Sequence, residues 1–337
     1  MDRREFLFVT GSAVLAGATF SSGQAGTVAR TTAKRLTLTV AKADSVNWVV
    51  DEARELARRI EQTSGERFAV AVADPLNVKA VGLKLLRASE LIEIDRAFGF
   101  ATGLPGSAAL EAEAVDAWLT EGGGQAALDE LAAGHGLKVL LAAHSGEQFL
   151  WSKKSLRTAA DFAGKCIKAE AMACYVAAGL GAEPWRIVPS DESGHLESGA
   201  VAAIEASIPD AIAQGLLQTA RYASTGALAP HGSAVALTIR LEMWDAMSPA
   251  DQAAITAAAR ENYRESLSVN HARSAMNRSA LQQTYGVVIS PVTHDVAATI
   301  QTIAGSVISQ AASGCPAAAK LNASYNAFLR RQQILAV

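Results

Sequence analysis

The residues that could do chemistry are scattered along this chain. Its six histidines include no pair four residues apart, so no helix presents two imidazoles to one metal ion. Ser145 lacks the glycine frame of a hydrolase nucleophile elbow, and the three glycines at 122–124 lack the Gly-Lys-Ser/Thr ending of a phosphate loop. The adjacent carboxylates Asp191 and Glu192 are typical of a solvated turn. We therefore expect no enzyme active site and no cofactor.

Composition excludes other classes of protein. The 337 residues carry 30 Lys+Arg and 33 Asp+Glu, a net charge of −3, and contain no long basic run. This balance argues against a nucleic-acid partner. Three cysteines cannot make a disulfide scaffold, and their spacing matches no zinc site. The length allows two domains, because single cores stop growing at about 250–300 residues.

The first residues have the pattern of an export signal. Arg3 and Arg4 precede an apolar run at 8–20, and small residues follow at 23–25. That run is shorter than the roughly 20 residues a membrane-spanning helix needs. We predict a signal over residues 1–25 that resembles a twin-arginine signal, and hence a periplasmic protein. An N-terminal anchor or a chance basic pair are the alternatives.

Apolar periodicity then predicts alternating strands and helices. Strands are expected at 36–40, 67–72 and 91–94, with helices at 46–64 and 78–86 between them. This β-α-β-α-β order predicts a parallel sheet covered by helices.

The middle and end of the chain continue this pattern. Helices are expected at 111–120 and 125–133, on either side of the three glycines, which we interpret as a turn. Ser248 and Pro249 are typical of a helix start, and the helix they begin is predicted to run to 283 and to brace both domains. Further strands are predicted at 137–143, 149–151, 164–169, 187–189, 200–206, 234–239 and 287–289.

Several short motifs follow one another in a fixed order. They are Trp118-Leu119, Gly122-Gly123-Gly124-Gln125, Ser145-Gly146-Glu147-Gln148, Trp151, Asp161-Phe162-Ala163-Gly164-Lys165-Cys166-Ile167-Lys168, Leu180-Gly181-Ala182-Glu183-Pro184, Leu196-Glu197-Ser198-Gly199, Ile204-Glu205 and Met243-Trp244-Asp245-Ala246-Met247-Ser248-Pro249-Ala250-Asp251-Gln252. This series resembles the solute-binding proteins of TRAP (tripartite ATP-independent periplasmic) transporters, the DctP family. It is most similar to the branch that binds 2-oxo acids and related monocarboxylates, over about residues 36–331.

The resemblance implies a fold and a function. The fold is a two-domain α/β periplasmic-binding-protein (Venus-flytrap) fold, with mixed, mainly parallel sheets and a long domain-spanning helix. Domain I would comprise 34–146 plus 238–265, and domain II 147–237 plus 266–331. Such a protein captures a small organic anion in an interdomain cleft and delivers it to a TRAP membrane permease without chemistry. Its hinge would lie near residues 145–150 and 232–238.

The resemblance also implies site residues. The family's arginine that clasps the substrate carboxylate corresponds to Lys168, a point charge in place of a planar fork. Gln148 and Glu205 match residues that hold a cation beside the carboxylate in the 2-oxo-acid branch. Alternatively, Lys168 is a surface lysine, Gln148 satisfies loop backbone, and Glu205 is a solvated carboxylate or a partner of Lys168.

The chain departs from the family pattern at the pocket walls. The tryptophan of the family's Glu-Trp pair is Ala206 here, and an aromatic-rich stretch is replaced by residues 223–228. We expect a larger pocket, or other wall residues such as Phe100, Trp151 or His231, although Trp151 fits a core position equally well. These departures leave one alternative function open: a degenerate paralogue that acts as a scaffold or sensory partner rather than in transport.

Overall fold

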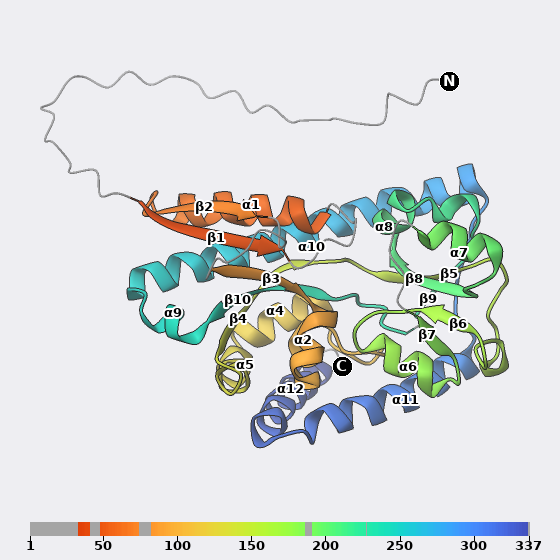
Figure 1. Cartoon of the computed structure of the whole chain (residues 1–337). Helices are drawn as coiled ribbons and strands as arrows, with labels where there is room; N and C mark the ends of the chain where they lie inside the picture. Colours follow the sequence, from red (N-terminus) through yellow and green to blue (C-terminus); the bar gives the residue numbers. More distant parts are fainter. Residues whose placement is uncertain (1–32, 41–47, 74–81, 186–190, 227, 336–337) are drawn as a thin grey trace, which may run out of the picture. The chain divides into compact units, whose positions relative to one another are not determined.

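Two mixed β-sheets form the framework of this two-domain protein (Figure 1). The computed structural model describes residues 33–335 except 41–47, 74–81, 186–190 and 227. The predicted export signal and the strand predicted at 187–189 lie outside the described residues. The first sheet has the order β2 (Phe68–Ala73), β1 (Lys34–Val40), β3 (Leu83–Arg87), β10 (Ala234–Arg240), β4 (Leu137–His144). The second has the order β11 (Val288–Pro291), β9 (Tyr222–Thr225), β5 (Gln148–Ser152), β8 (Ala203–Ser207), β6 (Cys166–Lys168), β7 (Glu183–Trp185).

Both sheets combine parallel and antiparallel pairs. In the first, β1 lies parallel to β2 and β3, whereas β10 runs antiparallel to β3 and β4. In the second, β6 is parallel to β7 and β8, and β11 to β9, while β5 runs antiparallel to β8 and β9. The predicted α/β fold with mixed sheets is confirmed.

The chain passes between the sheets through two short segments that touch each other. One joins β4 to β5, and the other joins β9 to β10. The Ser145 N–H donates to the Ser233 carbonyl at 2.9 Å, and the Gln148 N–H donates to the Pro230 carbonyl at 3.0 Å. The predicted hinge segments therefore lie side by side. The exact domain boundaries stay a prediction.

Helices cover the faces of the sheets. They are α1 (Trp48–Thr63), α2 (Ala88–Ile94), α3 (Gly99–Thr102), α4 (Ala112–Thr120), α5 (Gly124–Ala133), α6 (Ala173–Gly179), α7 (Glu192–Ser198), α8 (Ile208–Ala213), α9 (Leu241–Asp245), α10 (Pro249–Tyr285), α11 (His294–Ala312) and α12 (Pro316–Leu335), with 3-10 turns η2 (Arg96–Phe98), η3 (Ala159–Asp161) and η5 (Leu216–Gln218). Within the described part of the chain, no helix has the length and apolar character to cross a membrane.

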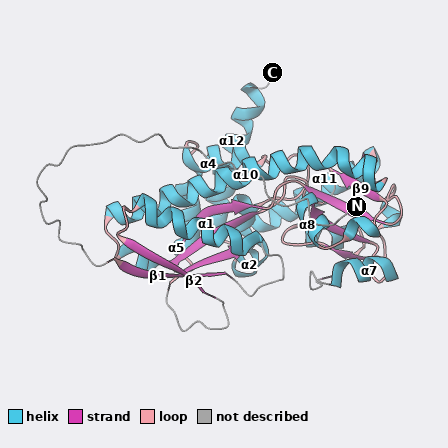
Figure 2. Ribbon diagram, turned by 90° about the horizontal axis from the view of Figure 1, so that it is seen from above, coloured by secondary structure: helices cyan, strands magenta, loops and turns pink. Residues whose placement is uncertain are grey.

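The long helix α10 connects the two halves of the protein (Figures 1 and 2). It begins where the Ser248 hydroxyl accepts the Asp251 N–H at 3.2 Å with Pro249 as its first residue, and it ends at Gly286 in the left-handed conformation. Along its length it contacts α1 and β4 of the first half, then α8 and β11 of the second. The predicted bracing helix is confirmed.

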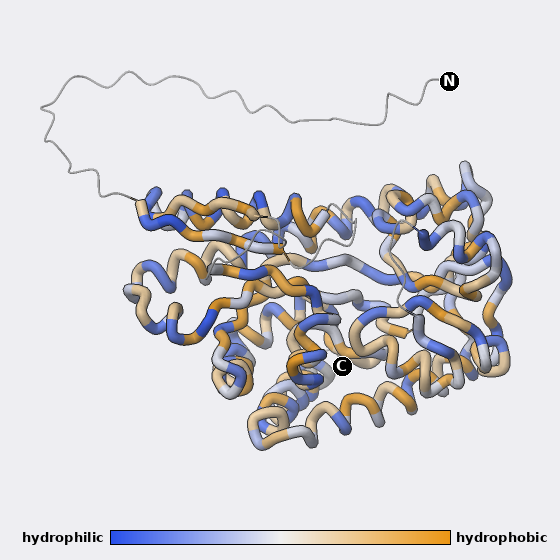
Figure 3. Tube along the Cα trace, in the orientation of Figure 1, coloured by the Kyte–Doolittle hydropathy of each residue, from blue (hydrophilic) through white to orange (hydrophobic). Residues whose placement is uncertain are grey.

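Helix α1 shows how the sequence builds a core. Val49, Ala53, Leu56 and Ile60 are buried on one face, as their spacing predicts. Figure 3 shows hydrophilic and hydrophobic residues alternating along this helix. The buried face packs with the strands of the first sheet and with α10 into one continuous hydrophobic cluster.

Two sequence predictions between residues 78 and 94 are wrong. Residues 83–87 form strand β3, not part of a helix, because Leu83 and Leu85 are buried on either side of exposed Lys84 with a period of two. Residues 91–94 belong to helix α2, not to a strand. The Glu90 carboxylate accepts the Arg87 N–H at 2.8 Å, which starts a helix instead.

Candidate ligand-binding site

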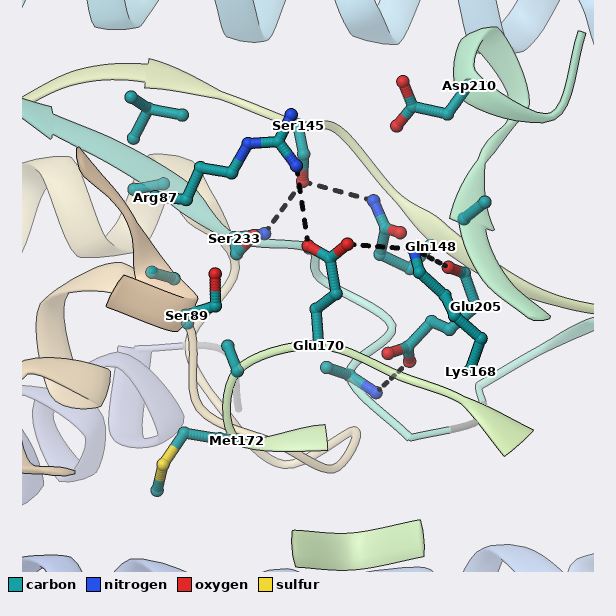
Figure 4. Close-up of a pocket in the computed structure, with 18 of the residues that line it drawn as sticks. Arg87, Ser89, Ser145, Gln148, Lys168, Glu170, Met172, Glu205, Asp210 and Ser233 are labelled. Atoms are coloured by element: carbon teal, nitrogen blue, oxygen red, sulfur yellow. Dashed lines mark hydrogen bonds and ion pairs between the residues drawn. The ribbon is translucent and has the colours of Figure 1, made fainter. Parts of the chain in front are cut away.

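A polar cavity lies where the two sheets face each other (Figure 4). Its volume is about 60 Å³, counted as the space open to the centres of water-sized molecules. A single water needs roughly 10–15 Å³ by this measure, so the cavity suits a ligand of a few heavy atoms. The polar residues at its wall are Arg87, Ser89, Ser145, Gln148, Lys168, Glu170, Glu205, Asp210, Gln214 and Ser233.

Lys168 lies buried at the end of strand β6. Its ammonium group is 2.9 Å from a Glu170 oxygen and 3.1 Å from a Glu192 oxygen, and it donates to the Glu205 carbonyl at 3.5 Å. Burial lowers the pKa of Lys168, but the carboxylates of Glu170 and Glu192 outweigh that effect and raise it above the usual value. Lys168 is therefore a fixed positive charge, and the surface-lysine alternative is wrong.

Glu170 joins cations from both sheets. One carboxylate oxygen pairs with Lys168, and the other lies 3.9 Å from the guanidinium of Arg87, at the end of β3 in the first sheet. Figure 4 shows the Glu170 carboxylate between the two side chains. The site thus already holds one carboxylate, that of Glu170, between an arginine and a lysine. A ligand carboxylate could bind the same two cations in its place.

Glu205 presents a second carboxyl group from strand β8. It is buried, and one oxygen accepts the Ala229 N–H at 2.9 Å. Burial raises the pKa of Glu205 to about 7, although the Ala229 N–H and the charge of Lys168 both oppose the shift. The alternative of a solvated carboxylate is wrong.

Asp210, in helix α8, and Gln214, at the end of that helix, contribute further oxygen atoms to the cavity wall. The Ser207 hydroxyl donates to Asp210 Oδ2 at 2.8 Å and accepts the Asp210 N–H, which fixes the start of the helix. Burial raises the pKa of Asp210. Gln214 Oε1 is buried and has no hydrogen-bond partner among the described residues.

Gln148 serves both the cavity and the crossing segment. Its Nε2 donates to the Gly146 carbonyl at 3.1 Å and to the Ser145 hydroxyl at 3.2 Å. The same hydroxyl accepts the Ser233 N–H of the second crossing at 3.0 Å. These bonds leave the Gln148 Oε1 acceptor for other partners.

Comparison with known families identifies this architecture. The family model DctP, described as bacterial extracellular solute-binding protein family 7, matches residues 96–313. The chain belongs to this family. Among curated protein sequences, none matches the chain.

Solved structures of solute-binding proteins share the fold. A TRAP transporter solute-binding protein from Bordetella bronchiseptica, with calcium and picolinate, has a TM-score of 0.77 at 21% identity, covering 89% of this chain and 93% of its own. One from Colwellia psychrerythraea, with calcium and pyruvate, has a TM-score of 0.80 at 18% identity, covering 90% and 96%. A Bordetella pertussis receptor that binds pyroglutamic acid has a TM-score of 0.70 at 15% identity, covering 87% and 100%.

The structure brings only some of the predicted site residues together. Lys168, Gln148 and Glu205 all line the cavity. Trp151 does not: it is fully buried in the core of the second half, where its indole N–H donates to the Ala206 carbonyl at 3.0 Å. Of the two positions that the sequence allowed for Trp151, pocket wall and core, it occupies the core.

Phe100 and His231 also lie away from the cavity. Phe100 is buried edge-on against Tyr325, with the ring centres 5.5 Å apart. His231 Nε2 donates to the Ser107 carbonyl at 3.3 Å and lines a separate hollow with His144 and His271. Neither residue lines the cavity around Lys168.

Sequence reasoning missed Arg87, Glu170, Glu192 and Asp210. Arg87 was hidden because its strand was predicted as a helix; the alternation of Leu83 and Leu85 was the available signal. Glu192 was expected in a solvated turn, but its side chain has 0% exposure and pairs with Lys168. Nothing in the local sequence shows that β6 would end beside it.

The residues present supply part of a cation site. Gln148 Oε1 and the Glu205 carboxylate are two oxygen donors of the kind that sodium and calcium prefer. In the described part of the chain no group of three or more His, Cys, Asp or Glu residues is arranged to hold a metal ion. A cation here would need further oxygen ligands besides these two.

Proposed function

We propose that this DctP-family protein is the periplasmic solute-binding subunit of a TRAP transporter, and that it captures a small carboxylate in the cavity around Lys168. The observation that carries the proposal is the placement of Arg87 and Lys168, one from each sheet, on the two oxygens of a single carboxylate. A ligand that takes the place of the Glu170 carboxylate contacts both halves of the protein, so its binding energy favours the closed form.

The ligand is handed on, not converted. The family consists of solute-binding proteins. We propose that the protein is exported through the twin-arginine-type signal at 1–25. In the periplasm it captures the ligand and delivers it to the TRAP membrane permease subunits. The polar cavity favours this function over a degenerate scaffold or sensory paralogue, in which an apolar or collapsed cavity would be expected.

A co-bound cation is part of the proposal. The relatives from Bordetella bronchiseptica and Colwellia psychrerythraea hold calcium beside picolinate or pyruvate, and a Pseudoalteromonas atlantica relative holds sodium and pyruvate. In this chain Gln148 and Glu205 would supply the protein oxygens. A cation between them and the ligand would offset the negative charge of Glu205.

A thermal-shift screen tests the proposal. The mature protein is melted with a panel of small organic acids and amino acids, with and without Na⁺ or Ca²⁺. A ligand at about 100 times its Kd adds about 2.7 kcal/mol, a rise of a few degrees in Tm. A hit among carboxylates supports the proposal. A cooperative melt with no hit across the panel contradicts it and favours the sensory or scaffold alternative.

A further inference from the structure

The ionisable groups at the cavity are predominantly acidic. Two cations, Arg87 and Lys168, stand against four carboxyl groups, those of Glu170, Glu192, Glu205 and Asp210. Like charges repel more strongly in a partly buried site than in bulk water. A ligand with only a carboxylate would add a fifth acid to this site, so its binding would need a compensating positive charge.

The two cations, Arg87 and Lys168, already pair with carboxylates of the protein. The three protons of the Lys168 ammonium face Glu170, Glu192 and the Glu205 carbonyl. Glu192 is completely buried beneath the lysine, whereas the Glu170 side chain is 41% exposed at the mouth of the site. A ligand carboxylate therefore reaches the cations by displacing Glu170, and the displaced acid still leaves the site rich in carboxylates.

The opposite side of the cavity offers acceptors. The Glu205 carboxylate accepts the backbone N–H groups of Ala229 and Glu170, whereas the Asp210 carboxylate accepts the Ser207 hydroxyl at 2.8 Å. Gln214 Oε1 has no donor among the described residues although it is buried. Figure 4 shows Asp210 and Glu205 on the side away from Arg87. A buried acceptor without a donor is costly, so this side calls for N–H groups.

We propose that the ligand is a small zwitterion, such as an α-amino acid, whose carboxylate contacts Arg87 and Lys168 and whose ammonium group lies against Glu205, Asp210 and Gln214. This inference rests on the proposed function and names the ligand class of the same site. The ligand brings its own positive charge, so the net charge of the site does not become more negative.

The residues at the cavity wall favour a small ligand whose positively charged group carries N–H donors. A quaternary ammonium group is recognised by aromatic faces, and Trp48 is the only aromatic residue among the described residues of the cavity wall. Carboxylate and amide acceptors instead bind a primary or secondary ammonium group. The cavity of about 60 Å³ suits a compact ligand such as one of the smaller amino acids.

Isothermal titration with L-alanine and pyruvate tests the inference, because the two share a three-carbon skeleton and differ in the ammonium group. Glycine with glyoxylate and L-serine with hydroxypyruvate extend the series, each with and without Na⁺ or Ca²⁺. We expect at least one amino acid to bind about 10-fold more tightly than its 2-oxo partner in metal-free buffer. D210N should weaken amino-acid binding by about 10-fold, and D245N, on the exposed surface of α9, should not.

Other outcomes separate the two proposals. If 2-oxo acids bind with Na⁺ or Ca²⁺ and amino acids do not, the inference fails and the proposed function stands. If amino acids bind but D210N and E205Q both leave their affinity unchanged, the ammonium position is wrong and the inference fails. If a cooperatively melting protein binds neither class and no other acid, both proposals fail.

Discussion

Glu205 is a buried carboxyl group that lines the candidate site, so its protonation affects stability. A carboxyl group whose pKa is raised in the folded protein is bound to a proton more strongly there than in the unfolded chain. The pKa of Glu205 rises from 4.5 to about 7 through burial. Below pH 4.5 the group is protonated in both states and costs no stability. Between pH 4.5 and 7 the unfolded chain releases this proton while the folded protein keeps it, so stability falls as the pH rises.

The variant E205Q tests this effect. We expect its free energy of unfolding to lose the decline between pH 4.5 and 7, gaining at most about 3 kcal/mol over the wild type at pH 7.5. Urea unfolding at several pH values measures it. E197Q, which changes an exposed carboxyl on α7, is the control. Parallel pH profiles for wild type and E205Q would contradict the burial argument.

At the residue scale, sequence patterns found part of the candidate site. Lys168, Gln148 and Glu205 came from ordered motifs and meet at the cavity. Glu192 and Asp210 could not be found in this way, because their closeness to Lys168 results from the packing of α7 and α8 against β8.

At the scale of elements, the three glycines at 122–124 show how a motif can serve packing. Gly123 is left-handed, and Gly124 opens helix α5 against the ring of Trp118. A Cβ at Gly124 would lie 2.4 Å from the indole. The turn predicted from the sequence is confirmed, and its third glycine leaves room for a buried tryptophan.

We expect G124A to lower the free energy of unfolding by about 1–3 kcal/mol, because the added methyl group must displace Trp118. Chemical denaturation measures the loss. G194A is the matched control: it lies in helix α7 with no atom within 4 Å of the new Cβ, so helix propensity should leave it neutral or slightly stabilised. Equal effects of the two variants would contradict the packing role.

Elements with long periodicity were predicted correctly, and the two errors between residues 78 and 94 fell on short elements. Helices α1 and α10 have apolar spacing over many turns or clear start signals, and both appear as predicted. The apolar run at 91–94 is too short for periodicity to separate a strand from a helix. There the contact between Glu90 and the Arg87 backbone decided the outcome.

At the scale of the whole molecule, the two crossing segments must stay close for the halves to act together. Gly232 is left-handed, and a Cβ there would lie 2.0 Å from the Gly146 carbonyl oxygen of the other crossing. The backbones can touch only because no side chain separates them.

We expect G232A to destabilise the protein by more than about 3 kcal/mol, since it combines left-handed strain with a backbone clash. G226A has the same kind of backbone angle but no atom within 4 Å, so it isolates the strain and should cost about 1–2 kcal/mol. Calorimetry of both variants checks this. A loss in G232A no larger than in G226A would show that the contact between the crossings carries no stability.

At the centre of the proposed function, Lys168 and Arg87 together hold the ligand carboxylate. Isothermal titration of the best ligand from the acid and amino-acid panels, into wild type, K168A, R87Q and K165A, tests this most directly. R87Q leaves buried Glu192 paired, and K165A removes an exposed lysine of the same segment. We predict at least about 30-fold weaker binding for K168A and R87Q, and wild-type affinity for K165A. Wild-type affinity in folded K168A and R87Q would contradict the account.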